Sequence, residues 1–273
     1  MRVQRHESAL GRWEMAHADP HPALRGQVLR YCGYSEDTAA PLRRREIATP
    51  QVTVIFSFGP SIDVGGERLT SFVAGLDESY GETEHAGHQR GLEVKLAPLA
   101  VRSLLGVPAR ELAGRVVPLD GVLGRSADEL VERLAVAPGW PERFALLDAV
   151  LAARLAQDQP RDIAHAWNRL LATHGGVSIA GLARELGWSR RRFGERFREH
   201  VGLAPKPAAR VLRFRRAVEL LERDDGTRLA AIAHECGYYD QAHFNRDFRA
   251  FAGSSPGDHL GRRLPDGGGV AAV

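Results

Sequence analysis

Two stretches near the C-terminus repeat one pattern, and this repeat constrains the fold more than any other feature of the sequence. The first stretch runs from residue 179 to 202 and the second from 229 to 253. Ala183 and Ala233 lie 50 residues apart, and the phenylalanines that follow lie 51 apart, so one residue has been added just after the turn glycine. A repeat kept in register in this way indicates one supersecondary unit that is present twice.

Each copy predicts two helices joined by a sharp turn. Apolar residues recur at i, i+3, i+4 and i+7 ahead of Gly187, which places an apolar stripe on the first helix. Gly187 can adopt the positive φ that such a turn often needs, and Gly237 takes its place in the second copy. Ser189 and Asp240 then stand where an N-cap of the second helix is expected. The pattern is that of a helix-turn-helix unit.

The second helix of each copy carries polar side chains on positions that its apolar stripe leaves exposed. Arginine, asparagine and glutamine have a hydrogen-bonding geometry that suits guanine and adenine edges. The exposed positions hold Arg190, Arg191, Glu195 and Arg198 in the first copy and Gln241, Asn245, Arg246 and Arg249 in the second. One helical hairpin alone is as often part of a core, but two in register with these side chains favour DNA binding.

A further helix is predicted between the two copies. Residues 208–223 carry Val211, Phe214, Val218 and Leu221 at helical spacing. A helix of about 17 residues is roughly 25 Å long. Together with the width of the flanking helices, it would hold the two second helices about one turn of DNA, roughly 34 Å, apart.

Positive charge is concentrated in the same region. Residues 177–264 contain 17 Lys and Arg against 11 Asp and Glu, and residues 189–216 contain 10 against 2, whereas the whole chain has a net charge of only +3. An arginine-rich solvated face would give similar counts. Because the charge coincides with the repeat, it indicates a surface for phosphates.

The second copy resembles the AraC/XylS family of bacterial transcription regulators. It carries the motif of that family, namely Ala233, Gly237, Tyr238, Phe244, Arg246, Phe248, Arg249, Gly253 and Pro256. The resemblance covers roughly residues 161–263. It implies an all-α C-terminal domain with two helix-turn-helix units joined by a long helix, which binds double-stranded promoter or operator DNA.

The resemblance also implies site residues. By position, base reading falls on Arg190, Arg191, Gly194 and Glu195 in the first unit and on Gln241, Ala242, Asn245 and Arg246 in the second. Gly194 has no side chain and Ala242 offers only a methyl group, so we assign base reading to the other six. We expect phosphate contacts from Ser189, Arg192, Arg198, Arg216 and Arg249.

Residues 1–120 are predicted to be mostly β, which makes the chain an α+β protein. The run Val52–Phe58 is rich in β-branched and aromatic residues and ends at a Gly-Pro pair. By analogy with sensor domains of the resembled family, we expect a cupin-like sheet or barrel. Residues 91–120 resemble the N-terminal domain of a subgroup whose small-molecule effector is unknown. A ligand is expected near Val54, Phe56 and Phe58, although core packing explains these residues equally well.

Residues 121–160 are predicted to be a helical linker or dimerisation segment. Residues 126–136 and 141–156 form amphipathic patterns, and residues 157–160 break the second of them. Their apolar faces suit pairing with a second copy of the chain in a homodimer, and packing on their own sheet has equal weight. Residues 264–273 are expected to form a disordered tail.

The sequence offers little that predicts catalysis. His85 and His88 could form half of a metal site, but their Gly-rich, charged surroundings favour a solvated loop. Cys32 and Cys236 form no Cys-x-x-Cys motif and are expected to pack in the interior. We therefore expect no enzyme, cofactor or metal site. The alternatives are a metal-dependent cupin-like enzyme fused to a DNA-binding module and a non-specific architectural DNA binder.

The N-terminus has no apolar signal region, and the chain has no apolar run of about 18 residues. These features predict a cytoplasmic protein without a membrane partner. A transcription regulator would also have RNA polymerase as a candidate partner.

Overall fold

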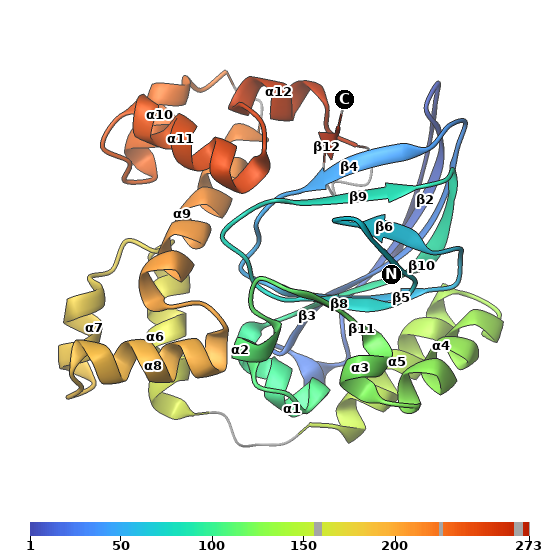
Figure 1. The fold of residues 1–273 in the computed structure, drawn as a ribbon, viewed down its shortest axis with the longest axis horizontal. Coiled ribbons are helices and arrows are strands. Elements are labelled where there is room, and N and C mark those ends of the chain that lie inside the picture. Colours follow the sequence, from blue (N-terminus) through green and yellow to red (C-terminus); the bar gives the residue numbers. More distant parts are fainter. Residues whose placement is uncertain (156–159, 224–225, 265–269, 273) are drawn as a thin grey trace.

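Two antiparallel sheets and the helices packed on them form the N-terminal domain, called the front domain below (Figure 1). The remaining helices form the C-terminal domain. The computed structural model describes residues 1–155, 160–223, 226–264 and 270–272. The break expected at residues 157–160 thus lies outside the described residues, except for Pro160. A mostly β N-terminal domain followed by a helical C-terminal domain confirms the predicted α+β class.

The larger sheet has seven strands in the order β1-β2-β3-β10-β5-β8-β11. Its neighbours all pair antiparallel, and its strands are β1 (Arg2–Ser8), β2 (Gly11–Ala18), β3 (Val28–Thr38), β10 (His88–Leu96), β5 (Val52–Ser57), β8 (Phe72–Ala74) and β11 (Val116–Pro118). The smaller sheet has the order β12-β4-β9-β6-β7, with β12 (Val270–Ala271), β4 (Leu42–Glu46), β9 (Gly81–His85), β6 (Ile62–Val64) and β7 (Glu67–Leu69). The two sheets face each other (Figure 1). Residues of both sheets line a cavity.

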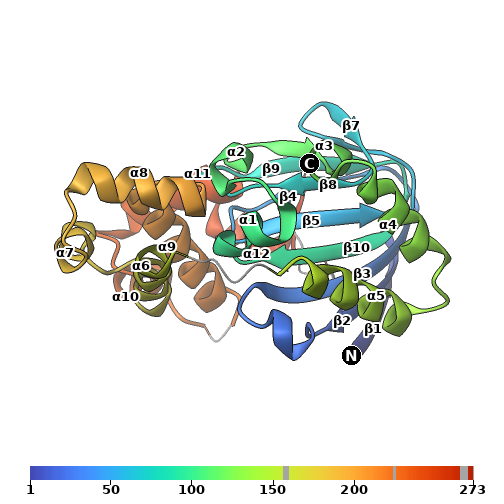
Figure 2. The same cartoon turned by 90° about the horizontal axis from the view of Figure 1, so that it is seen from below.

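Helices cover the outer face of the larger sheet (Figure 2). They are η1 (Pro22–Leu24), η2 (Pro98–Ala100), α1 (Val101–Leu105), α2 (Ala109–Leu112), α3 (Leu119–Leu123), α4 (Ser126–Val136) and α5 (Trp140–Ala153). The ring of Tyr31 on β3 stacks on Phe144 of α5 at 5.7 Å between centroids. At Gly33, a Cβ atom would lie 2.4 Å from the Trp140 ring, so only glycine allows α5 to approach the sheet this closely.

The residues expected to line a ligand site belong to the core under these helices. Side chains alternate between the two faces of a strand, so Val54 and Phe56 on β5 point to one face while Thr53 and Ile55 point to the other. Val54 and Phe56 are each 2% exposed and join the helix-covered core, whereas Thr53 and Ile55 line the cavity. Phe58 lies beneath the guanidinium of Arg143. The prediction of a ligand near Val54, Phe56 and Phe58 is therefore wrong in its choice of face.

The apolar faces of α4 and α5 are used within the chain. Leu130 and Leu134 on α4 and Leu147 and Leu151 on α5 are all buried in the core of this one molecule. Of the two expectations for these helices, packing on their own sheet is the one that the structure shows.

The C-terminal domain is helical throughout its described residues. Its helices are α6 (Arg161–Ala172), α7 (Ile179–Glu185), α8 (Arg190–Val201), α9 (Pro205–Leu221), α10 (Leu229–Glu235), α11 (Gln241–Ala252) and α12 (Pro256–Gly261). The predicted connecting helix is α9, which has 17 residues and begins three residues earlier than expected, at Pro205. Proline suits the first turn of a helix because the N–H that it lacks would be unpaired there.

The C-terminal tail departs from the expected disorder in its described part. Leu264 is 3% exposed, and Val270–Ala271 form β12, which pairs with Arg44 and Arg45 of β4. Residues 265–269 and 273 lie outside the described residues. The sequence of the tail is rich in small residues, and the open edge of β4 supplies the hydrogen bonds that its own propensity does not predict.

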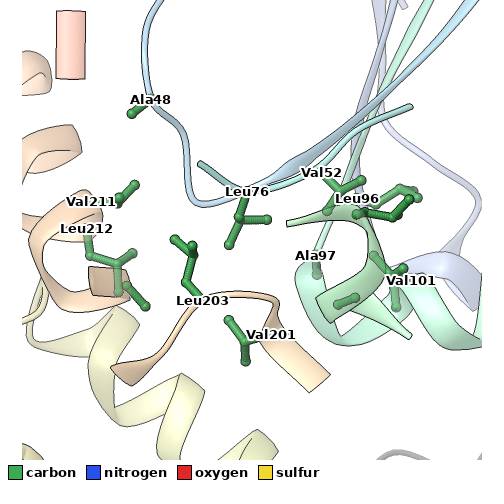
Figure 3. Close-up of a cluster of buried hydrophobic side chains, with 14 of the residues drawn as sticks. Ala48, Val52, Leu76, Leu96, Ala97, Val101, Val201, Leu203, Val211 and Leu212 are labelled. Carbon is green, nitrogen blue, oxygen red and sulfur yellow. The ribbon is translucent and has the colours of Figure 1, made fainter. Parts of the chain in front are cut away.

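An apolar interface joins the two domains (Figure 3). Ala48 and Leu76 of the front domain face Leu203, Val211 and Leu212 of the helical domain, and all five are buried. Burying one leucine side chain contributes about 1.5–3 kcal/mol, so this cluster favours one arrangement of the domains. Backbone bonding reinforces it, because the N–H of Ala48 donates to the carbonyl oxygen of Phe251 at 2.9 Å.

Candidate nucleic-acid interface

The two helix-turn-helix units have the turn and cap geometry that their sequences predict. Gly187 and Gly237 have φ of 66° and 72°, the left-handed region that favours glycine. The Ser189 hydroxyl accepts the N–H of Arg192 at the start of α8, and the Asp240 carboxylate accepts the N–H of His243 at the start of α11. The caps fix where each second helix begins and satisfy backbone donors there.

Aromatic side chains orient each second helix. Phe193 and Phe197 of α8 are fully buried with ring centroids 5.6 Å apart, and Phe197 also meets Trp167 of α6. In the second unit, Phe244 and Phe248 of α11 are buried at the same 5.6 Å spacing. With one face of each helix held inward, the opposite face is presented to solvent.

The exposed face of α8 carries the residues predicted for it. Arg190, Arg191, Arg192, Glu195 and Arg198 are all exposed. The Nε of Arg191 lies 2.9 Å from Oε1 of Glu195, and this hydrogen bond and its charge raise the pKa of Arg191. Arg192 stacks over the ring of Trp188 at 4.9 Å. Gly194, as expected, contributes no side chain.

The exposed face of α11 agrees with the prediction except at one position. Gln241, Arg246 and Arg249 are exposed, but Asn245 is half-buried, and its Oδ1 is buried with no hydrogen-bond partner among the described residues. Asn245 follows the buried Phe244 by about 100° around the helix and so lies beside the apolar stripe. The expectation that Asn245 is an exposed side chain was therefore wrong, while its amide edge remains on the boundary of the exposed face.

Arg216 differs from the other predicted phosphate contacts because it has partners inside the protein. Its guanidinium lies 3.0 Å from Glu235 of α10 and 3.7 Å from Glu219 of its own helix. These two carboxylates compensate its charge. We therefore withdraw Arg216 from the set that is expected to bind phosphates.

Tyr239 is a candidate contact that the sequence reasoning missed. Its side chain is 92% exposed, whereas the preceding Tyr238 is 4% exposed and packs on Phe244. It immediately precedes Asp240, the N-cap of α11. The signal was present in the sequence, because the residue added to the second copy falls at this position.

The two second helices lie near opposite ends of α9 and share one orientation relative to the front domain (Figure 1). The C-terminal end of α8 packs on α2, where a Cβ at Gly202 would lie 3.2 Å from the carbonyl oxygen of Ala109. The C-terminal end of α11 meets β4, where Arg45 donates to the carbonyl oxygen of Gly253. Both N-terminal ends, which in helix-turn-helix proteins contact base edges, point away from these contacts.

The two histidines considered for a metal are not brought together. His85 is buried beside Glu36 and Arg44, whereas His88 is exposed and bonds to Asp37. Among the described residues, no group of three or more His, Cys, Asp and Glu side chains is placed to hold a metal ion. In the same part of the chain, no helix has the length and apolar character needed to cross a membrane.

Comparison with known proteins agrees with the geometry of the C-terminal domain. The model of a helix-turn-helix domain family matches residues 182–262. The transcriptional activator RhaS of Pectobacterium atrosepticum, described as HTH-type, is 30% identical over 80 residues. The family match is thus to a helix-turn-helix domain and lies within the C-terminal part of the chain.

A second family model matches the chain outside that domain. The model of a domain of unknown function (DUF6597) matches residues 16–118. The match to RhaS spans 29% of this chain and only 28% of that protein.

Solved structures are similar over different parts of the chain. A probable AraC family transcriptional regulator from Rhodopseudomonas palustris is 27% identical and covers 39% of this chain and 100% of its own, with a TM-score of 0.35. ToxT from Vibrio cholerae covers 85% of this chain and 94% of its own at 10% identity, with a TM-score of 0.48.

Proposed function

We propose that this chain is a sequence-specific DNA-binding transcription regulator. The observation that carries the proposal is the pair of capped helices α8 and α11, each held by buried phenylalanines with its basic face and N-terminal end exposed. The 17 residues of α9 span roughly 25 Å, so the two units suit successive major grooves on one face of a duplex.

The exposed residues divide into two roles. Base edges would be read by Arg190, Arg191, Glu195, Gln241, Asn245 and Arg246, because these side chains lie on or beside the exposed faces of the two helices. Phosphates would be held by Ser189, Arg192, Arg198 and Arg249, together with the helix N-termini. A hydrogen bond to Glu195 already orients the guanidinium of Arg191.

The front domain would act as the sensor and regulatory part. Its cavity lies between the two sheets, and its rim contacts the helical domain, so a small-molecule effector could act on DNA binding through this contact. We extend the proposal to a homodimer, to RNA polymerase as a partner and to the cytoplasm, where the chromosomal DNA of a bacterium lies. Neither α4 nor α5 has a free apolar face for the dimer, so we place no dimer contact on them.

Selection of bound sequences from a random duplex library tests the proposal with the full chain. We expect enrichment of a bipartite site whose two halves are about 10 base pairs apart, one helical turn of DNA. Footprinting on the enriched site should protect both halves on the same face of the duplex. Binding with no enrichment over random DNA would instead support the architectural alternative and overturn the proposal.

The enzyme alternative receives no support from the site geometry. It requires His85 and His88 to share a metal ion, but their rings have separate partners, Glu36 and Asp37. We therefore do not carry it forward.

A further inference from the structure

The cavity between the two sheets has a mostly apolar lining. It measures about 270 Å³. Strands of both sheets contribute the apolar wall, which consists of Met15, Ile55, Ile62, Val64, Phe72 and Val116. A cavity of this kind, with a few polar groups among apolar side chains, is the usual form of a small-molecule site.

Two residues that line the cavity, Arg44 and Glu36, form a buried ion pair. Arg44 donates to Glu36, and the Nε2 of His85 lies 3.4 Å from the same carboxylate. The Nδ1 of His85 accepts the N–H of Gly87, so its proton is on Nε2 and points to Glu36. Burial would raise the pKa of Glu36, but His85 and Arg44 outweigh it and the pKa lies below its usual value. Glu36 therefore stays ionised and neutralises Arg44.

A second matched group lies on the larger sheet, on β3 and the neighbouring β10. Glu93 on β10 lies 2.8 Å from Lys95 and 3.1 Å from Arg30. Burial would raise the pKa of Glu93, but the two cations outweigh it and lower the pKa. The side chain of Arg30 is 50% exposed, so water solvates its charge. The side chain of Lys95 is 14% exposed and forms an ion pair with Glu93.

The remaining charged residues at the cavity are in contact with water. They are at least partly exposed: Glu46, Asp77, Glu82, Glu84 and Arg115. A ligand that enters fully must lose its own hydration. The buried charges of the lining, Glu36 with Arg44 and Glu93 with Lys95, are already paired, so a charged ligand that enters fully would gain no partner from them, and burying an unpaired charge is costly.

We infer that the cavity binds an uncharged, largely apolar small molecule with a single hydrogen-bonding group. The hydroxyl of Tyr34 lies on the cavity wall and can serve that group. Burial raises the pKa of Tyr34, so the hydroxyl keeps its proton and can donate a hydrogen bond.

Occupancy of the cavity can reach the DNA-binding domain by a short route. Ile47, Ala48 and Thr49 line the cavity directly after β4. Ala48 also donates its N–H to the carbonyl oxygen of Phe251, near the end of α11. This regulatory consequence rests on the proposed function, whereas the binding of the ligand does not.

Two fluorescent probes that differ by one charge test the inference on the full chain without DNA. N-phenyl-1-naphthylamine is uncharged, and 8-anilinonaphthalene-1-sulfonate carries the same rings with a sulfonate. We expect saturable binding of one equivalent of the uncharged probe, with the sulfonate bound at least tenfold more weakly. Equal affinity for both probes, or no binding of the uncharged one, would overturn the inference.

A substitution inside the cavity and one outside it test where the uncharged probe binds. Ile55→Trp fills the cavity and should abolish binding, whereas the control Arg68→Trp adds the same indole on the exposed β7 and should leave binding unchanged. Binding that persists in a folded Ile55→Trp protein would place the probe elsewhere and overturn the inference.

A second variant keeps the test decisive if Ile55→Trp does not fold. Glu93→Gln leaves Lys95 and Arg30 without their carboxylate, so it should strengthen binding of the sulfonate by tenfold or more. If this variant prefers the uncharged probe over the sulfonate as strongly as the wild-type protein does, the paired charges do not determine that preference, and the inference is overturned.

The coupling between the cavity and DNA binding is tested by measuring the affinity of the protein for the selected duplex with and without the uncharged probe. We expect at least a threefold change, and none in Ile55→Trp. No change in the wild-type protein would overturn the coupling. Failure of the protein to select any DNA would overturn the proposed function alone, because the probe titrations contain no DNA.

Discussion

The guanidinium of Arg45 donates a hydrogen bond to the carbonyl oxygen of Gly253, with 3.0 Å between Nη1 and O. The two residues are separated by 208 positions in the chain, one at the end of a front strand and the other at the end of α11. Gly253 has φ of 68°, and a Cβ there would lie 2.9 Å from both Arg45 and Tyr80. The second helix-turn-helix unit is therefore seated on the front domain at its terminating residue.

Removing this contact should loosen the second unit without unfolding either domain. A hydrogen bond from a charged donor contributes about 1.5–3 kcal/mol, so Arg45→Ala should speed amide exchange about tenfold or more at the end of α11 and in α12. Hydrogen-exchange mass spectrometry measures this. The matched control is Arg43→Ala. Arg43 lies on the same strand and forms an ion pair with Glu82. Equal exchange in both variants would contradict the prediction.

Arg246→Ala should weaken binding to the selected duplex by about 1–3 kcal/mol and relax the preference at one base position. The reason is that an exposed arginine near the start of α11 is placed to make paired hydrogen bonds with a guanine. Fluorescence anisotropy with the selected duplex and with single-base variants gives both quantities. An equal loss on specific and random duplexes would show that Arg246 reads no base.

Arg198→Ala and Arg216→Ala should behave differently although both remove one positive charge. Arg198 is exposed and expected to bind a phosphate, so its loss should lower affinity on all sequences and reduce the salt slope by about one. Arg216 is bound to Glu235 and Glu219, so its loss should leave the slope unchanged. Binding isotherms at several salt concentrations decide, and a reduced slope for Arg216→Ala would restore its original assignment.

Tyr239→Ala should weaken DNA binding several-fold with no change in thermal stability. The ring is 92% exposed and contributes nothing to the core, yet it stands at the N-terminal end of α11. Tyr239→Phe distinguishes ring contact from a hydroxyl bond to phosphate. The control is Tyr238→Phe, because Tyr238 is buried and its hydroxyl has no hydrogen-bond partner among the described residues. Full affinity in Tyr239→Ala would remove this residue from the interface.

The helical domain should lose stability in acid partly through Glu222. Burial would raise the pKa of Glu222, but His259 and Arg263 outweigh it and lower the pKa. A lowered carboxylate pKa stabilises the fold above the ordinary value near 4.5, and this contribution is lost as pH falls through the folded-state value.

Glu222→Gln should therefore narrow the difference in Tm between pH 7 and pH 3.5 by about 2–4 °C. Thermal unfolding followed by circular dichroism measures it. Glu67→Gln, a change on the exposed β7, should retain the full difference. If Glu222→Gln also retains it, the ion pairs of Glu222 contribute nothing to acid stability.

Local signals in the sequence predicted the helical domain well. The turn glycines, the caps Ser189 and Asp240 and the four-residue spacing of the phenylalanines act over a few residues, and the structure confirms each of them. The error at Asn245 arose because a rotation of about 100° separates a buried from an exposed position on a helix. Such a boundary depends on how the helix leans on its neighbours.

The features that the sequence could not predict depend on contacts between residues that are far apart in the chain. Alternation on β5 divides Val54 from Ile55, but the sequence does not say which face meets helices and which meets a cavity. Likewise, β12 exists because β4 offers an open edge more than 220 residues earlier in the chain. The apolar faces of α4 and α5 suited either partner, and only the packed fold selects one.

The return of the C-terminus to β4 means that the DNA-binding module is fastened at both ends, by the segment that enters α6 and by β12. A module suspended from a single linker could swing freely, whereas this one cannot leave the front domain without breaking the pairing of β12 with β4. Substitution of Val270 by proline would remove a backbone donor from that pairing and so weaken one of the attachments of the module.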